Sequence, residues 1–185
     1  ANPVFVAADL LSQAEHGVDS QAMLITTSEK LQAEVMEEVN RQLAKLPRRE
    51  IAAKSLENSK LILVKDMDEA LELTNAYAPE HLIVETENYL EVAERVINAG
   101  SVFLGSLTPE SAGDYASGTS HTLPTNGYAK AYSGVSLDSF IRKITFQEIL
   151  PQGMKVIGPA IEEMAANELL DAHKNAVTVR LNTLK

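Results

Sequence analysis

The histidines of this chain, with the carboxylates and amides near them, are the residues whose types could carry chemistry. The sequence has no cysteine, so any metal must be held by imidazole, carboxylate or amide groups. An imidazole changes its charge near neutral pH and can also bind zinc through a ring nitrogen. Taken singly, a histidine is most often an ordinary polar residue, so its neighbours decide how it is interpreted. The histidines are His16, His81, His121 and His173.

Gln13 and His16 are spaced three residues apart in a segment with a helical pattern, so they project from one face of a helix. That spacing can bring an amide oxygen and an imidazole nitrogen to one metal ion. A neutral amide is a weak ligand, however, and the same pair is equally consistent with a solvated helix face.

Glu80 and His81 are adjacent, directly after Pro79, where the chain turns into a strand-like run. A carboxylate beside an imidazole could provide two proton-transfer groups for one reaction. Neighbouring residues of a regular strand point to opposite faces of the sheet. The two side chains can therefore address one site only if the backbone near Pro79 is irregular.

Asp114 opens a long segment, residues 113–134, which has four glycines, one proline and three tyrosines but no helical or strand periodicity. Connections of this length inside compact domains are usually functional or disordered, and disordered ones are poor in aromatic residues. We therefore expect an ordered loop. It follows a predicted strand, at the sheet edge where open α/β folds bind ligands. His121, in the same loop, is either a partner of the site or a loop hydrogen bonder.

Glu168 and His173 lie in the helical tail of the chain. Five residues apart on a continuous helix they would not share a face. A common site would require a break near Asp171, and otherwise both are ordinary surface residues.

Strand and helix patterns alternate along the first part of the chain at spacings that suit β-α-β crossovers. We predict an α/β domain over residues 1–137, with a parallel, doubly wound (Rossmann-like) sheet. The expected strands are 4–6, 22–25, 60–64, 81–84 and 101–105. The expected helices are 8–16, 28–46, 66–78 and 88–100, with a more polar helical segment before residue 60.

Residues 138–185 have a different pattern and form a predicted C-terminal arm. Ile141 to Ile149 is expected to be extended, and Gly158-Pro159 is expected to open a helix with proline at its first position. The segment is too short for an independent core, so it must pack on this domain or on a partner chain.

Composition excludes several classes of protein. Apolar residues make up 45% of the chain, which is enough for a sizeable core, and the formal charge of −10 argues against nucleic acid and anionic membranes as partners. No apolar run approaches the roughly 18 residues of a membrane span, and no signal peptide is recognisable, which predicts a soluble cytoplasmic protein. Neither GxGxxG nor a P-loop is present. The strand-like run so close to Ala1 suggests a piece of something longer or a processed end.

Taken together, these segments resemble the C-terminal part of histidinol dehydrogenase, over essentially the whole chain. The segments that carry the resemblance are DLLSQAEHG (9–17), YAPEHLIV (77–84), GSVFLG (100–105), AGDYASGTSHTLPTNGYA (112–129) and ELLDAHKNAVTVR (168–180). The family enzyme is a zinc-dependent oxidoreductase of histidine biosynthesis that uses two NAD to oxidise L-histidinol, through the aldehyde, to L-histidine.

The resemblance implies a role for each candidate residue. Glu80 and His81 correspond to the two catalytic proton-transfer residues, and His121 matches a histidine near the site. The implied zinc ligands are Gln13, His16, Asp114 and His173. The implied substrate contacts are Gln13, His16, His81, Asp114, Glu168 and His173.

The chain departs from the family pattern in its length. The family protein has a longer N-terminal portion that holds much of the NAD site, so no NAD-binding residue is expected in this chain. In the family the C-terminal arm is exchanged between the subunits of a homodimer, which agrees with an arm that cannot fold alone. The isolated chain is expected to be inactive. The alternatives are a metal-binding or dimerisation fragment, one chain of a larger assembly, and a zinc hydrolase, which the absence of HExxH weakens.

Overall fold

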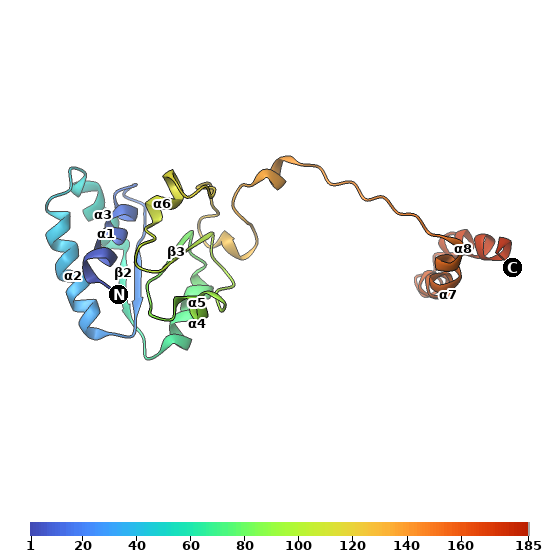
Figure 1. The fold of residues 1–185 in the computed structure, drawn as a ribbon, viewed down its shortest axis with the longest axis horizontal. Helices are drawn as coiled ribbons and strands as arrows, with labels where there is room; N and C mark the ends of the chain where they lie inside the picture. Colours follow the sequence, from blue (N-terminus) through green and yellow to red (C-terminus); the bar gives the residue numbers. More distant parts are fainter. Residues whose placement is uncertain (185) are drawn as a thin grey trace. The chain divides into compact units, whose positions relative to one another are not determined.

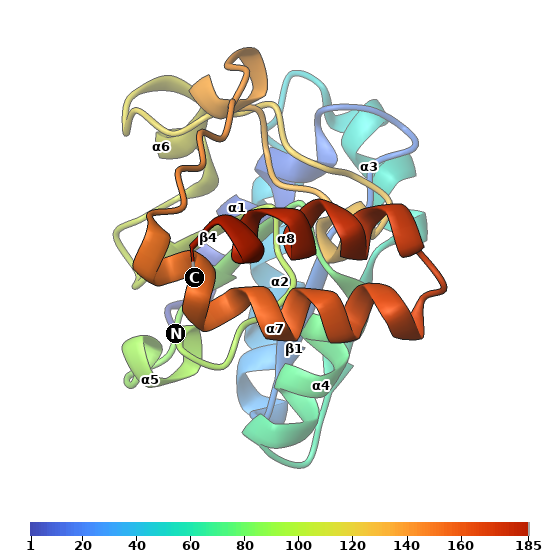
Figure 2. The same cartoon turned by 90° about the vertical axis from the view of Figure 1, so that its right-hand side faces the viewer.

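The computed structural model describes residues 1–184 and divides the chain into two compact units. The first unit is Ala1–Phe140, and the second begins at Ile141. Figures 1 and 2 show the elements within each unit. The first unit has an α/β fold with parallel strand pairs, and the second is helical. No helix among the described residues is long and apolar enough to cross a membrane.

The chain begins with helix α1 (Pro3–Ala14), so the expected strand over residues 4–6 is wrong. The Asn2 side chain caps the helix by accepting a hydrogen bond from the Val4 amide at 3.0 Å, and Pro3 occupies the first turn. An Asn-Pro start is a strong helix N-terminal signal, and it overrides the strand preference of the β-branched residues. Ala7, Leu11 and Ala14 form the buried face of α1.

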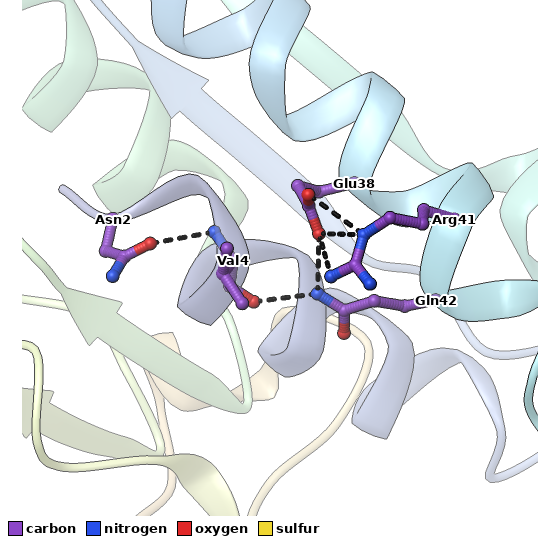
Figure 3. Close-up of polar contacts among 5 residues, drawn as sticks. All are labelled: Asn2, Val4, Glu38, Arg41 and Gln42. Carbon is purple, nitrogen blue, oxygen red and sulfur yellow. Dashed lines mark hydrogen bonds and ion pairs between the residues drawn. The ribbon is translucent and has the colours of Figure 1, made fainter.

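Helices α2 (Glu29–Leu43) and α3 (Arg49–Asn58) connect strand β1 (Met23–Thr26) to strand β2 (Lys60–Leu63). The two strands pair in parallel. Figure 3 shows how α1 and α2 are joined: Gln42 Nε2 of α2 donates to the Val4 carbonyl at 3.0 Å, beside the Glu38–Arg41 ion pair. Helix α2 ends at Leu43, three residues before the expected end.

The second strand pair follows helix α4 (Met67–Tyr77), and its strands β3 (His81–Val84) and β4 (Ser101–Leu104) are also parallel. The expected helix over residues 88–100 is reduced to the short α5 (Tyr89–Ala93). Leu71, Val84 and Val92 form the buried cluster that joins α4, β3 and α5. Parallel pairing is confirmed, but the described residues form two two-stranded sheets rather than one doubly wound sheet.

The expected loop over residues 113–134 begins inside a helix. Helix α6 (Glu110–Tyr115) contains both Gly113 and Asp114, and a short 3-10 helix, η1 (Tyr128–Lys130), lies near the end of the segment. The side chains of Tyr115, Tyr128 and Tyr132 are all exposed. A second 3-10 helix, η2 (Leu137–Phe140), closes the first unit.

The second unit contains α7 (Pro151–Asn167) and α8 (Asp171–Thr183), which pack against each other. Residues 141–150 contain no helix or strand. The expected helix start at Gly158-Pro159 is wrong, because Pro151 occupies the first turn and Pro159 lies inside α7. A helix break near Asp171, which a site shared by Glu168 and His173 would require, is present: α7 ends at Asn167, and Leu169 adopts a left-handed conformation with φ of 58°.

Candidate functional site

A cleft of about 1200 Å³ in the first unit runs along strands β1 and β3. Side chains with proton-transfer or ligand chemistry line it from α1, from β3 and from α6: Asp9, Gln13, Glu80, His81, Glu85 and Glu110. Concave sites with a few convergent polar groups are the usual places for small-molecule binding. The cleft therefore brings together residues that are far apart in the sequence.

Helix α1 supplies Gln13 in its last turn and His16 just beyond its end. The Oε1 atom of Gln13 is buried and has no hydrogen-bond partner. A buried carbonyl oxygen without a partner is costly, so such an atom indicates a ligand that completes it. His16 is exposed.

Glu80 lies in the short connection between α4 and β3, and His81 is the first residue of β3. Ala78 ends α4 in a left-handed conformation with φ of 55°, which supplies the irregular backbone that the pair requires. The Glu80 carbonyl accepts a hydrogen bond from the Ser101 amide at 2.9 Å. A Cβ atom on Gly100 would lie 2.5 Å from that carbonyl oxygen, so only glycine permits this approach. Glu80 and His81 both line the cleft.

Helix α6 supplies Glu110 and Asp114, one turn apart. One ligand atom each from His16, Glu110 and Asp114 lies within 4.8 Å of the others. Imidazole nitrogen and carboxylate oxygen are zinc ligands, and the Gln13 oxygen lacks a partner. The residues present therefore fit a divalent metal such as zinc.

Two acidic side chains at the cleft, Glu80 and Asp9, have raised pKa values, chiefly because they are buried. Burial raises the pKa of Glu80, and Glu110 and Asp114 raise it further against the opposing effect of His81 and His16. Burial, with the charges of Glu85 and Glu110, raises the pKa of Asp9 to about 6. A carboxylate with a raised pKa is a better base than an exposed one, which suits proton transfer near neutral pH.

The structure does not bring all of the predicted residues together. Gln13, His16, Glu80, His81 and Asp114 all belong to the first unit and gather around α1, β3 and α6. His121 is exposed in the segment after α6. Glu168 and His173 lie at exposed positions of the second unit, at the end of α7 and in α8. Their roles stay predictions.

Glu110 is a site residue that the sequence analysis missed. Only 3% of its surface is exposed, and its Oε1 atom lies 3.9 Å from His81 Nε2. A sequence signal was available: Pro109 followed by a glutamate is typical of a helix start, and residues 110 and 114 share a helix face. The expected loop began at residue 113, which hid this helix.

The comparison with protein families covers nearly the whole chain. The family profile described as histidinol dehydrogenase matches residues 1–181. The chain belongs to the histidinol dehydrogenase family. It is 82% identical to a histidinol dehydrogenase of Bacteroides fragilis over 185 residues, which are 100% of this chain and 43% of that protein. It is 52% identical to the histidinol dehydrogenase of Escherichia coli, again over 100% of this chain and 43% of that protein.

A solved histidinol dehydrogenase has the same fold. The crystal structure of the enzyme from Elizabethkingia anophelis is 56% identical and superposes with a TM-score of 0.93, covering 100% of this chain and 42% of that chain. The chain thus spans less than half the length of these histidinol dehydrogenases. Its expected place in the C-terminal part of the longer proteins stays a prediction.

Proposed function

We propose that the full-length protein containing this chain is an L-histidinol dehydrogenase of histidine biosynthesis. Family membership supports the reaction class, since the similar proteins carry that name. The observation that carries the proposal is a single cleft lined by Glu80, His81 and Gln13, whose side-chain oxygen is buried and has no hydrogen-bond partner. Glu110 also lines this cleft, and it groups with the possible metal ligands His16 and Asp114. Proton-transfer groups beside a metal group suit the oxidation of an alcohol that also bears ligand nitrogens.

Zinc would be held by Gln13, His16 and Asp114, with His173 as the further ligand. The metal would supply positive charge that binds and orients the imidazole and amine of the substrate, and it has no redox chemistry of its own. Two NAD would accept the electrons, at a site that we place outside this chain. The residues of this chain then bind the substrate and move protons.

His81 would remove the hydroxyl proton of histidinol as a hydride leaves its carbon for the first NAD, which gives the aldehyde. Glu80 would take a proton from water as the water oxygen adds to the aldehyde carbon. The hydrated carbon would then give a second hydride to the second NAD, and the resulting carboxylic acid would release its remaining proton to solvent, which leaves the carboxylate of histidine. The raised pKa of Glu80 supports this role, because a stronger base accepts the water proton more readily.

Glu168 and His173 would enter the site from the arm of the other subunit of a homodimer. The exposed apolar side chains of residues 141–150 support an arm that packs on another surface: Phe146 is 90% exposed and Ile144 is 67% exposed. Large apolar side chains that are exposed close together usually mark a surface that contacts another protein.

The test is NADH formation by the purified full-length protein with L-histidinol. We expect about two NADH per histidine formed, loss of activity after metal chelation, and recovery with zinc. The 185-residue chain alone should form no NADH. A full-length protein that binds zinc but does not oxidise histidinol would overturn the proposal and leave a metal-binding or dimerisation role. Hydrolysis of an ester or amide substrate in place of oxidation would favour a zinc hydrolase.

A further inference from the structure

The packing of α6 against β4 places Glu110 next to His81. Gly113, one turn after Glu110, lies against the ring of Phe103 on β4, where a Cβ atom would be 2.8 Å from ring carbon Cε1. The missing side chain lets α6 approach the strand closely. Glu110, the first residue of α6, is buried as a result, with a side chain that is only 4% exposed.

The two oxygens of the Glu110 carboxylate have different partners. Oε2 accepts a hydrogen bond from Ser12 Oγ of α1 at 3.1 Å, which fixes the carboxylate relative to that helix. The Ser12 hydroxyl has one hydrogen, and its Oγ atom also lies 2.9 Å from the Asp9 carbonyl oxygen. The Asp9 carbonyl and the Glu110 carboxylate therefore compete for one donor. Oε1 faces His81 Nε2 at 3.9 Å.

Glu110 Oε1 and His81 Nε2 are both buried, and neither has a hydrogen-bond partner. One can accept a hydrogen bond and the other can donate one, so each is the partner that the other lacks. Catalytic hydrogen bonds are often long without substrate and shorten when the site closes. The ring of Phe103, 5.9 Å from the His81 ring, limits how far the imidazole can turn away.

We propose that Glu110 is a positioning residue that accepts the Nε2–H of His81 and so holds the imidazole in one tautomer and one orientation. A proton on Nε2 leaves Nδ1 as the basic nitrogen. His81 therefore takes the hydroxyl proton of the substrate through Nδ1. The inference rests on the proposed function and assigns the atom that acts in it.

The first test is spectroscopic and does not need activity. Nitrogen-15 NMR of the full-length protein, labelled at histidine, distinguishes the two tautomers, and the signals lost in His81→Asn identify His81. We expect the Nε2–H form in the wild type and a changed tautomer or a mixture in Glu110→Gln. The matched control is Glu57→Gln, at an exposed position of α3, which should leave the signals unchanged. An Nδ1–H form in the wild type, or no change in Glu110→Gln, would overturn the inference.

The second test separates positioning from metal binding. In Glu110→Gln we expect kcat to fall roughly 10- to 100-fold, as for other residues that orient a catalytic side chain, with KM nearly unchanged and zinc retained. Ser12→Ala should act in the same direction with a smaller loss. The double variant with His81→Asn should be no slower than His81→Asn alone, because both act through one imidazole.

Loss of zinc in proportion to activity would make Glu110 a ligand and overturn the positioning role. If the wild type does not oxidise histidinol at all, the proposed function fails, and the tautomer measurement still decides on the Glu110–His81 contact. If Glu110→Gln does not fold, Ser12→Ala carries the same measurements, and unchanged kcat with an unchanged His81 signal there would overturn the inference.

Discussion

At the residue scale, Glu80 shows how the surroundings change the pKa of a carboxyl group. It shares the cleft with the like charge of Glu110, which raises its pKa, and with His81, which lowers it, while burial is the largest effect. Adjacent residues with different surroundings can serve as two bases in two steps of one reaction. The division of work between Glu80 and His81 is therefore testable.

Glu80→Gln should slow the oxidation of histidinal more than the oxidation of histidinol, because only the aldehyde step needs water to be activated. Positioned proton transfer is typically worth about 10²–10⁴ in rate, which sets the expected loss in the aldehyde step. Stopped-flow assays of the full-length protein started from each substrate make the comparison. Equal losses in both steps would contradict the assignment.

Asp9→Asn should stabilise the protein at pH 7.5 and have little effect at pH 4.5. Because the folded-state pKa of Asp9 is raised to about 6 by burial and by Glu85 and Glu110, the folded protein holds this proton more tightly than the unfolded chain does. The stability that Asp9 contributes is thus lost as pH rises through about 6. Thermal melts at the two pH values measure the difference, with the exposed Asp19→Asn as control. A difference that does not change with pH would refute the expectation.

At the element scale, the site depends on two close approaches that glycines permit. Gly113 lets α6 lie on Phe103, and Gly100 lets the start of β4 pair with the backbone of Glu80. These contacts join β4 to α6, which carries Glu110 and Asp114, and to the start of β3, where the proposed catalytic pair lies.

Gly100→Ala should destabilise the protein and impair the site together. The new Cβ would meet the Glu80 carbonyl oxygen at 2.5 Å, and this backbone atom cannot move aside without disturbing β3. Overpacking of this kind typically costs about 1–3 kcal/mol in unfolding free energy. Chemical denaturation measures it. Gly153→Ala is the matched control, because its nearest contact is an ordinary 3.5 Å, and it should be neutral or stabilising. Equal behaviour of the two variants would contradict the packing argument.

At the scale of the whole molecule, the expected site is divided between two units of the chain. Glu80 and His81 belong to the first unit, while Glu168 and His173 belong to the second. If the arm is exchanged in a dimer, each complete site takes its catalytic pair from one subunit and His173 from the other.

Mixed dimers test this exchange. Glu80→Gln and His173→Asn variants should each be inactive alone, yet a heterodimer of the two would keep one intact site. Random pairing of equal amounts should therefore restore about a quarter of wild-type activity, because half of the dimers are mixed and each has one good site. Two differently tagged subunits, co-expressed and assayed, give the measurement. No recovery in purified heterodimers would show that each site is built within one subunit.

Local patterns in the sequence determined most elements of the fold. The predicted strands 81–84 and 101–105 match β3 and β4 to within a residue, and the capping pair Asp66 and Glu69 marks the start of α4. These signals act between residues a few positions apart, so the chain displays them without tertiary contacts. The same reasoning failed at residues 4–6, where the strand preference of the side chains was outweighed by the cap before them.

The sequence by itself also determined the family and the candidate residues, since both depend on residue types in fixed order. Only the tertiary structure decided which of them meet. Glu110 lies 98 positions from Ser12, yet it accepts a hydrogen bond from the Ser12 hydroxyl. It lies 29 positions from His81, yet its Oε1 atom is 3.9 Å from His81 Nε2. No local pattern encodes such distances, because burial, shape and the packing of α6 on β4 set them. The physical reason is that chemistry at this site depends on contacts between elements, which form only when the whole first unit folds.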